Sequence, residues 1–211
     1  MGEQEHYFTA RPSSTAERRT IEVELAGRTM AVQTAGGVFS ADHVDLGTRV
    51  LLRSVPAPPR TGDLLDLGCG WGPIALSLAV QSPEAHVWAV DVNERALDLV
   101  RRNAAAAGLQ NVTAVTPDGV PPDVRFATVW SNPPVRIGKE ELHTLLRLWL
   151  TRLEPAAEAW LVVGRHLGAD PLLRWLQDEL GPAVRTERAA SAKGFRVLRA
   201  EAADLPAGTT A

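Results

Sequence analysis

The chain has few of the features that mark an exported or membrane-bound protein. Only one of its 211 residues is cysteine, which rules out a disulfide within the chain. The start lacks the apolar core of a signal peptide, and no apolar run approaches the roughly 20 residues that cross a bilayer. The five histidines are scattered without the spacing of metal ligands. We therefore expect a soluble, cytoplasmic protein without a metal site.

Lysine is also scarce, since only Lys139 and Lys193 accompany the arginines, and the formal net charge is -3 at pH 7. This charge does not mark a generally basic nucleic-acid-binding protein, so any contact with RNA would have to come from a local patch. No internal repeat is present. With 45% hydrophobic residues the chain is long enough for one well-filled core, whereas two domains would be cramped.

The most informative stretch is LLDLGCGWGP, from Leu64 to Pro73. An apolar run ends at Asp66, a turn with three glycines follows, and Pro73 opens an alanine- and leucine-rich helix. Glycines leave no Cβ in the way, so backbone N–H groups at the helix start can approach a ligand with polar or negative groups. A GxGxxG dinucleotide motif starting at Gly68 would need glycine where Pro73 stands, which disfavours NAD or FAD. A turn that needs glycine only for packing is the alternative.

Strand and helix patterns alternate from Asp63 to Leu153. Strands are expected at Asp63–Leu67, His86–Val90, Val112–Thr116 and Phe126–Ser131, and helices at Pro73–Val80, Glu94–Ala107 and Glu140–Arg152. A fifth strand at Ala159–Val163, a helix at Asp170–Leu180 and a hairpin of Ala183–Ala189 with Phe195–Ala200 complete the pattern. This order predicts an α/β fold with a buried parallel sheet, helices on both faces and ligands at the carboxyl ends of the strands.

The domain boundaries are expected near residues 60 and 200. Residues 1–60 form an N-terminal extension, residues 61–200 the main domain and residues 201–211 a flexible tail. In the extension, alternation over Thr20–Thr34 predicts a short hairpin. A helix beginning near Asp45 and stopped by Pro56 is expected to lie over the glycine turn.

Two acidic residues follow the next two strands. Asp91 ends the run HVWAVD, where its carboxylate can accept hydrogen bonds from a pair of ribose hydroxyls. A favourable interaction with the following helix N-terminus is the structural alternative. Asp118 occupies the corresponding place after TAVTP, but Asp118-Gly119 is equally an ordinary turn pair.

A second signal is the sequence SNPPV, from Ser131 to Val135, at the end of the strand FATVW. Two prolines fix the backbone and remove two N–H donors, leaving carbonyl acceptors and the Asn132 side chain toward the cleft. Such a set of acceptors suits an amine, which could donate its two hydrogens to the Asn132 side-chain oxygen and the Pro133 carbonyl. The alternative is that the Asn-Pro-Pro sequence only ends the strand and has no role in binding.

Together, the segments GVFSADHVDLGTRVLL, LLDLGCGWGP, AVDVNERAL, SNPPVRIGK and SAKGFRVLRA resemble the ribosomal RNA small-subunit guanine-N2 methyltransferase family, and the opening HYFTARPSS is similar to its short, archaeal-type relatives. The likeness covers almost the whole chain. It implies the Rossmann-like class I methyltransferase fold, with a seven-stranded sheet and an antiparallel C-terminal hairpin. It also implies S-adenosylmethionine as methyl donor and, as acceptor, the N2 amine of a guanine in 16S ribosomal RNA, free or in the small subunit.

The resemblance also implies roles for individual residues. The cofactor contacts are Asp66, Gly68, Cys69, Gly70, Asp91, Val92, Asp118 and Asn132, with Asp91 at the ribose and Asp118 at the adenine amino group. The catalytic residues are Asn132, Pro133 and Pro134, and the substrate contacts are Phe39, Val135, Arg136 and Lys139.

Two departures from the family bear on the substrate. The longer bacterial members carry a further N-terminal domain that helps with RNA, for which this chain leaves no room. Position 135 is valine where an aromatic often stacks on the target base. Phe8, Phe39 and Phe195 could supply that stacking or be core residues. Arg136 and Lys139 could meet phosphates or be ordinary surface charges.

Other functions remain open at this point. The Asn-Pro-Pro corner is also compatible with a protein methyltransferase that acts on a glutamine amide, although Val135 argues mildly against it. A small-molecule N-methyltransferase and a cofactor-binding domain without turnover are further alternatives. The protein could be a monomer or a homodimer.

Overall fold

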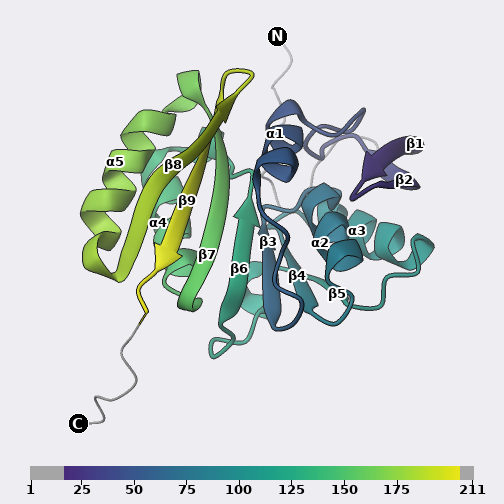
Figure 1. Cartoon of the computed structure of the whole chain (residues 1–211). Helices are drawn as coiled ribbons and strands as arrows, with labels where there is room; N and C mark the ends of the chain where they lie inside the picture. The colour runs from purple at the N-terminus through teal and green to yellow at the C-terminus, as the bar shows by residue number, and fades with distance from the viewer. Residues whose placement is uncertain (1–16, 205–211) are drawn as a thin grey trace.

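The computed structural model describes residues 17–204 and has a seven-stranded sheet at its centre (Figure 1). The strands lie in the order β5-β4-β3-β6-β7-β9-β8. Their bounds are β3 (Asp63–Leu67), β4 (His86–Val90), β5 (Val112–Val115), β6 (Phe126–Ser131), β7 (Leu153–Gly164), β8 (Val184–Ala192) and β9 (Phe195–Ala202). Strands β3 to β7 are parallel, and β9 is antiparallel to both of its neighbours. The predicted fold class is therefore confirmed.

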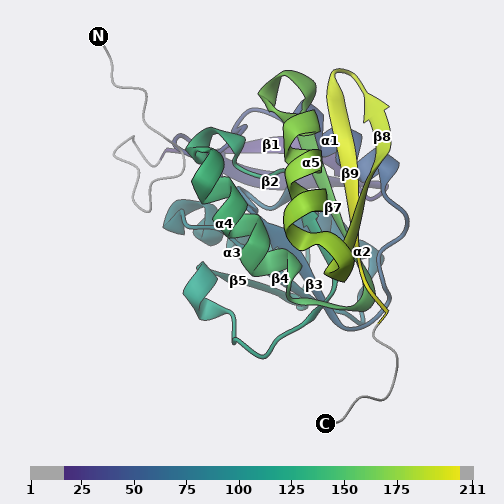
Figure 2. The same cartoon turned by 90° about the vertical axis from the view of Figure 1, so that its left-hand side faces the viewer.

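Helices cover both faces of the sheet. One face carries α1 (Leu46–Ser54), α2 (Pro73–Gln81) and α3 (Glu94–Ala106), which share a buried cluster that includes Leu51, Leu78 and Val100. The other face carries α4 (Lys139–Leu150) and α5 (Ala169–Leu180), seen nearest the viewer in Figure 2. Four short turns of 3-10 helix, η1 (Pro117–Gly119), η2 (Val135–Ile137), η3 (Arg165–Leu167) and η4 (Gly181–Ala183), complete the connections.

Strand β7 is longer than the sequence pattern predicts, since it begins at Leu153 and not at Ala159. Pro155 favours a break there because it lacks an N–H, and Ala156 has a left-handed φ of 59°. The pairing with β6 absorbs this irregularity through a register shift between Phe126 and Thr128. At the other end of the chain, β9 continues through Ala202, so the start of the expected tail belongs to the sheet.

The N-terminal hairpin is present as predicted and slightly longer: β1 (Arg18–Leu25) pairs with β2 (Arg28–Ala35) around a turn at Ala26 and Gly27. It packs on α2 and α3 with a shared buried cluster that includes Val32 and Leu99. The Asn103 side chain on α3 exchanges two backbone hydrogen bonds with Gln33, at 2.7 Å and 3.0 Å. The hairpin thus forms a hydrophobic cluster of its own with the outer sides of α2 and α3.

The segment between β2 and α1 crosses the loops that follow β3 and β4. Three donors from these loops hold it: Asn93 Nδ2 bonds Gly37 O at 2.8 Å, an Arg95 guanidinium nitrogen bonds Gly36 O at 2.6 Å, and Trp71 Nε1 bonds Ser40 O at 3.1 Å. Asp45 then caps α1 by accepting from Thr48 N at 3.1 Å. The predicted helix is confirmed. Its N-terminus lies beside the glycine turn, whereas its body packs on β7, β9 and α2.

Candidate active site

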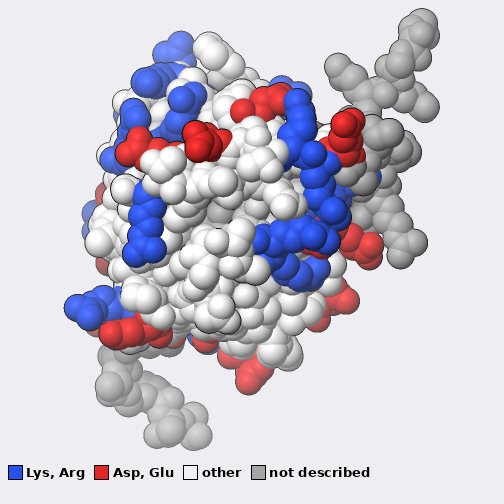
Figure 3. All heavy atoms as spheres, turned by 90° about the vertical axis from the view of Figure 1, so that its right-hand side faces the viewer, with Lys and Arg blue, Asp and Glu red and all other residues white. Residues whose placement is uncertain are grey.

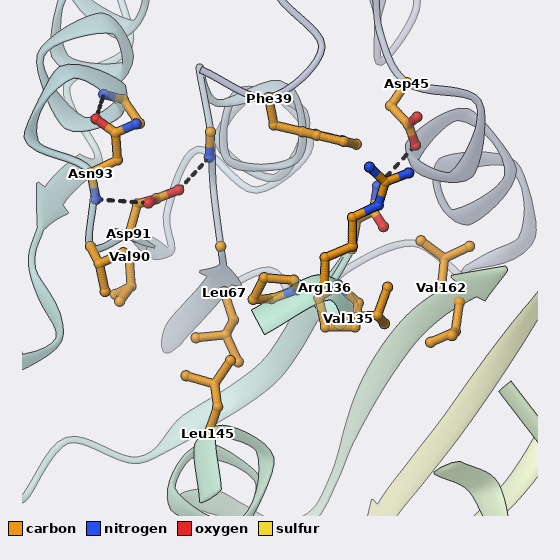
Figure 4. Close-up of a pocket in the computed structure, with 18 of the residues that line it drawn as sticks. Phe39, Asp45, Leu67, Val90, Asp91, Asn93, Val135, Arg136, Leu145 and Val162 are labelled. Atoms are coloured by element: carbon orange, nitrogen blue, oxygen red, sulfur yellow. Dashed lines mark hydrogen bonds between the residues drawn. The ribbon is translucent and has the colours of Figure 1, made fainter. Parts of the chain in front are cut away.

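A cavity of about 350 Å³ opens at the carboxyl ends of the parallel strands. Figure 4 shows Val90, Asp91 and Asn93 on one side of it and Val135, Arg136 and Val162 on the other, with Phe39 between. Open α/β sheets bind ligands at this end because the polar loops that follow the strands meet there. The cavity therefore has two halves, one built by the loops after β3 and β4 and the other by those after β6 and β7.

The glycine turn forms the wall between the halves. Gly68 and Gly70 line the cavity, with φ of 77° and 54°. A Cβ added at Gly68 would lie 3.7 Å from Pro134 Cδ and 3.9 Å from Asn132 O. The turn and the Asn-Pro-Pro corner therefore converge on one cavity, which is the geometric condition for a reaction between two ligands bound there.

Two residues of the motif lie behind the turn, outside the cavity lining. Asp66 is completely buried and its Oδ2 accepts from Ala75 N at 2.8 Å, which ties β3 to the start of α2. Burial raises the pKa of Asp66 to about 8. Cys69 is also buried, beside a second hollow of about 20 Å³, and burial raises the pKa of its thiol. Asp66 and Cys69 thus shape the turn from within the protein.

Asp91 faces the first half of the cavity. Its Oδ2 accepts from Gly70 N and its Oδ1 from Asn93 N, each at 2.9 Å. Burial raises the pKa of Asp91, and the backbone N–H groups act in the opposite direction. Each carboxylate oxygen keeps acceptor capacity for a ligand hydroxyl. Val92, exposed at 43%, lines the same half.

Asp118, expected at the adenine, and Lys139, expected at the substrate, lie outside the cavity lining. Pro117 of η1 lines the cavity, whereas the adjacent Asp118 is exposed, with its pKa lowered by a hydrogen bond from the Thr116 side chain. Lys139 is exposed at the start of α4 and does not line the cavity, whereas Arg136 does.

The Asn-Pro-Pro corner is held by two other segments. Ser131 Oγ donates to Leu67 O at 2.7 Å, which ties the ends of β6 and β3. The Asn132 Nδ2 atom lies 2.9 Å from Asp45 Oδ2 and 3.1 Å from Thr48 Oγ1 (Figure 4 shows Asp45). A carboxylate can only accept hydrogen bonds, so the atom that faces Asp45 must be the amide NH₂. Both amide hydrogens are thereby used at α1, and the Asn132 oxygen is left for a ligand.

Several lining residues were not predicted from the sequence. Asp45 and Thr48 are separated from Asn132 by 87 and 84 residues, so no local pattern connects them. Gly164, which ends β7, and Leu167, which follows it, line the second half. Of the three phenylalanines considered for stacking, Phe39 and Phe195 line the cavity, and Phe8 lies outside the described residues.

Two kinds of feature are absent from residues 17–204. No helix there is long and apolar enough to cross a membrane. No cluster of three or more His, Cys, Asp or Glu side chains in that part of the chain could hold a metal ion.

Comparison with known proteins places this site in a family. Residues 29–199 match the methyltransferase small domain. A relative in Bacillus subtilis (strain 168), named "Uncharacterized protein YbxB", is 32% identical over 200 residues, which are 93% of this chain and 98% of that protein. The ribosomal RNA small subunit methyltransferase C of Aeromonas hydrophila is 36% identical over 150 residues, which are 68% of this chain and 43% of that protein.

A solved structure agrees with these sequence relatives. The 16S rRNA N2 methyltransferase RsmC of T. thermophilus, solved in complex with AdoMet and guanosine, superposes with a TM-score of 0.75 at 25% identity, covering 88% of this chain and 50% of that one. The chain therefore spans about half the length of these rRNA methyltransferases. The resemblance expected from the sequence is confirmed, and the chain belongs to the methyltransferase small-domain family.

Proposed function

We propose that this chain transfers the methyl group of S-adenosylmethionine to the N2 amine of a guanine in 16S ribosomal RNA. The observation that carries the proposal is the orientation of Asn132, whose amide oxygen is left as an acceptor beside the glycine turn. The names of the small-subunit methyltransferases that the chain resembles support the choice of acceptor.

The first half of the cavity fits the cofactor. Gly68 and Gly70 let backbone groups approach a ligand closely, and a Cβ at Gly70 would have nothing within 4 Å, so the space beside it is open. Asp91 would accept hydrogen bonds from the ribose hydroxyls, and Asp118, at the edge of the cavity, would approach the adenine amino group. When bound, the cofactor supplies an electrophilic methyl group on a sulfonium.

The second half fits a planar amine. Its two hydrogens would be donated to Asn132 Oδ1 and to the carbonyl of Pro133, which already accepts from Val135 N at 2.8 Å and keeps one lone pair. Pro133 and Pro134 have no N–H that would compete for the lone pair of the amine. Alignment of this kind can supply roughly 7 to 11 kcal/mol of a barrier. No strong base is needed before attack, because the nitrogen loses its proton as it becomes cationic.

The test uses tritiated S-adenosylmethionine with 30S subunits, deproteinised 16S RNA and, as control acceptors, 50S subunits and ribosomal protein. We expect label in 16S RNA that co-migrates with N2-methylguanosine after nucleoside digestion. Asn132→Ala should nearly abolish the transfer while binding of S-adenosylhomocysteine and the melting temperature stay close to wild type. Full activity in Asn132→Ala, or label in a glutamine of a ribosomal protein, would contradict the proposal.

A further inference from the structure

The mouth of the cavity differs in charge between its two halves. Acidic Asp91 lines the first half, and Asp118 is exposed next to the lining residue Pro117. The second half is bordered by three basic residues from three different elements, here called the basic rim: Arg136 on η2, Arg165 on η3 and Lys193 in the turn between β8 and β9. This asymmetry stands out in a chain whose formal net charge is -3.

Contacts between the elements bring the basic rim to one edge of the cavity. Arg136 itself lines the cavity. Arg165 follows the lining residue Gly164, and its backbone N bonds Gly194 O at 2.8 Å, which places η3 against the turn that holds Lys193.

The rim cations are exposed, and none of them forms an ion pair within residues 17–204. Acidic side chains nearby are already engaged: Asp45 binds Asn132, and Asp170 lies 3.5 Å from Arg196 and 4.0 Å from Arg188. A cation without a local counterion is available to an external anion.

Several basic residues elsewhere have acidic partners. On the face that carries the hairpin and α3, red side chains lie beside the blue ones (Figure 3). There Arg18 and Arg102 both pair with Asp98, at 3.1 Å and 2.9 Å, and Arg19 pairs with Asp42 at 2.9 Å. Arg18, Arg19 and Arg102 are therefore neutralised locally, unlike the cations of the basic rim.

Exposed apolar side chains also lie at the mouth of this cavity. The exposed large hydrophobic residues among those described are Phe39, Val92, Leu148 and Leu167, and three of these four line the cavity. Phe39 is 37% exposed and Leu167 51% exposed. Apolar side chains bordered by cations form the combination that binds an unstacked nucleotide, because the base contacts the apolar groups and the flanking phosphates contact the cations.

We propose that the basic rim binds the phosphates on either side of an unstacked nucleotide in single-stranded RNA, whose base enters the cavity between Phe39 and Leu167. The proposal rests on the proposed function, since it supplies the RNA contact that guanine methylation at Asn132 requires. A guanine amine inside a duplex is inaccessible to a side chain at the base of a cavity, so the nucleotide has to leave its stack. Negative charge at the first half repels phosphate, so we expect the RNA strand to cross only the second half of the cavity mouth.

The experiment compares two double charge reversals. Arg165→Glu with Lys193→Glu alters the rim, and Arg60→Glu with Arg185→Glu is the matched control, because both control residues are exposed near the amino ends of β3 and β8, at the opposite edge of the sheet. Binding of a fluorescein-labelled, guanine-containing single-stranded RNA is measured with saturating S-adenosylhomocysteine over a range of salt concentrations. Thermal melting and titration of S-adenosylhomocysteine establish that both variants fold and bind cofactor product.

Each phosphate contact with a single strand contributes about 0.7 to the slope of log affinity against log salt concentration. The rim variant should therefore lose about 1.4 of this slope and bind about tenfold more weakly at about 0.15 M salt. The control variant should stay within about twofold of wild type. Equal RNA affinity of the rim and control variants would overturn the proposal, as would methyl label in protein with no measurable RNA binding.

The outcomes also separate this proposal from the proposed function. In one outcome, the wild-type protein binds the RNA more tightly than the rim variant and yet forms no N2-methylguanosine. That result would contradict the proposed function but support RNA binding by the basic rim. Formation of N2-methylguanosine with an RNA affinity that rim reversal leaves unchanged would contradict the rim alone.

Discussion

The contact between Asp45 and Asn132 leads to a prediction about rate. Asp45→Ala removes the carboxylate that lies 2.9 Å from Asn132 Nδ2, leaving only Thr48 to hold the amide. A hydrogen bond to a charged group is worth about 1.5 to 3 kcal/mol. If that energy aligns the Asn132 oxygen, its loss should lower kcat by roughly 10- to 150-fold, since about 1.4 kcal/mol corresponds to a factor of ten.

Asp45 also caps α1 through Thr48 N, so Asp45→Ala has a second effect. Loss of a cap costs about 0.5 to 2 kcal/mol of stability. Asp45→Ser separates the two roles, because serine is a good N-cap but its hydroxyl is too short to reach Asn132. Asp45→Asn is the conservative variant, because its amide oxygen can still accept from both Thr48 N and Asn132 without the charge.

The assay measures kcat, the KM for S-adenosylmethionine and the melting temperature of all three variants. We expect Asp45→Ser to melt close to wild type but to share the low kcat of Asp45→Ala, and Asp45→Asn to recover part of the rate. The KM for the cofactor should change little, because Asp45 acts on the acceptor side. A wild-type kcat in Asp45→Ser, or a loss confined to the cofactor KM, would refute the positioning role.

Two further predictions concern the buried carboxylates. Because the pKa of Asp66 is raised to about 8, above about 3.9 for an exposed aspartate, the folded chain keeps a proton that the unfolded chain releases in this window. The free energy of unfolding should therefore fall as the pH rises from about 4 to 8, and denaturant titrations of Asp66→Asn should lack that part of the slope. Asp91→Ala leaves Gly70 N and Asn93 N without their acceptor and removes the predicted ribose contact. Calorimetry should show S-adenosylhomocysteine binding weakened by roughly 10- to 150-fold, from about 1.5 to 3 kcal/mol per charged hydrogen bond, and an unchanged affinity would rule out the assignment.

The sequence predicts the two corners of the site because each is encoded locally. Gly68 permits the positive φ that its turn requires, and the prolines after Asn132 fix the backbone through their rings. Both conformations can therefore be predicted without knowledge of any distant partner. Their convergence follows from the parallel sheet, since the carboxyl ends of neighbouring strands meet at one edge.

Side-chain direction is less accessible from sequence. Asp66 belongs to the glycine motif, yet its carboxylate turns inward to Ala75 N because the helix start needs an acceptor there. Asp45 reaches Asn132 across 87 residues, and such a contact depends on how α1 packs on β7 and β9, which no periodicity within α1 reveals. Likewise, Pro155 predicts a break that the register shift in β6 and β7 accommodates.

The segment that carries Phe39 and Asp45 is fastened by donors from Trp71, Asn93 and Arg95, all of which follow β3 or β4. The loops that would bind the methyl donor are thus hydrogen-bonded to the segment that carries Asp45, which orients Asn132. Occupancy of the Asp91 side should consequently stiffen the opposite wall, so that each of the two ligands increases the affinity for the other.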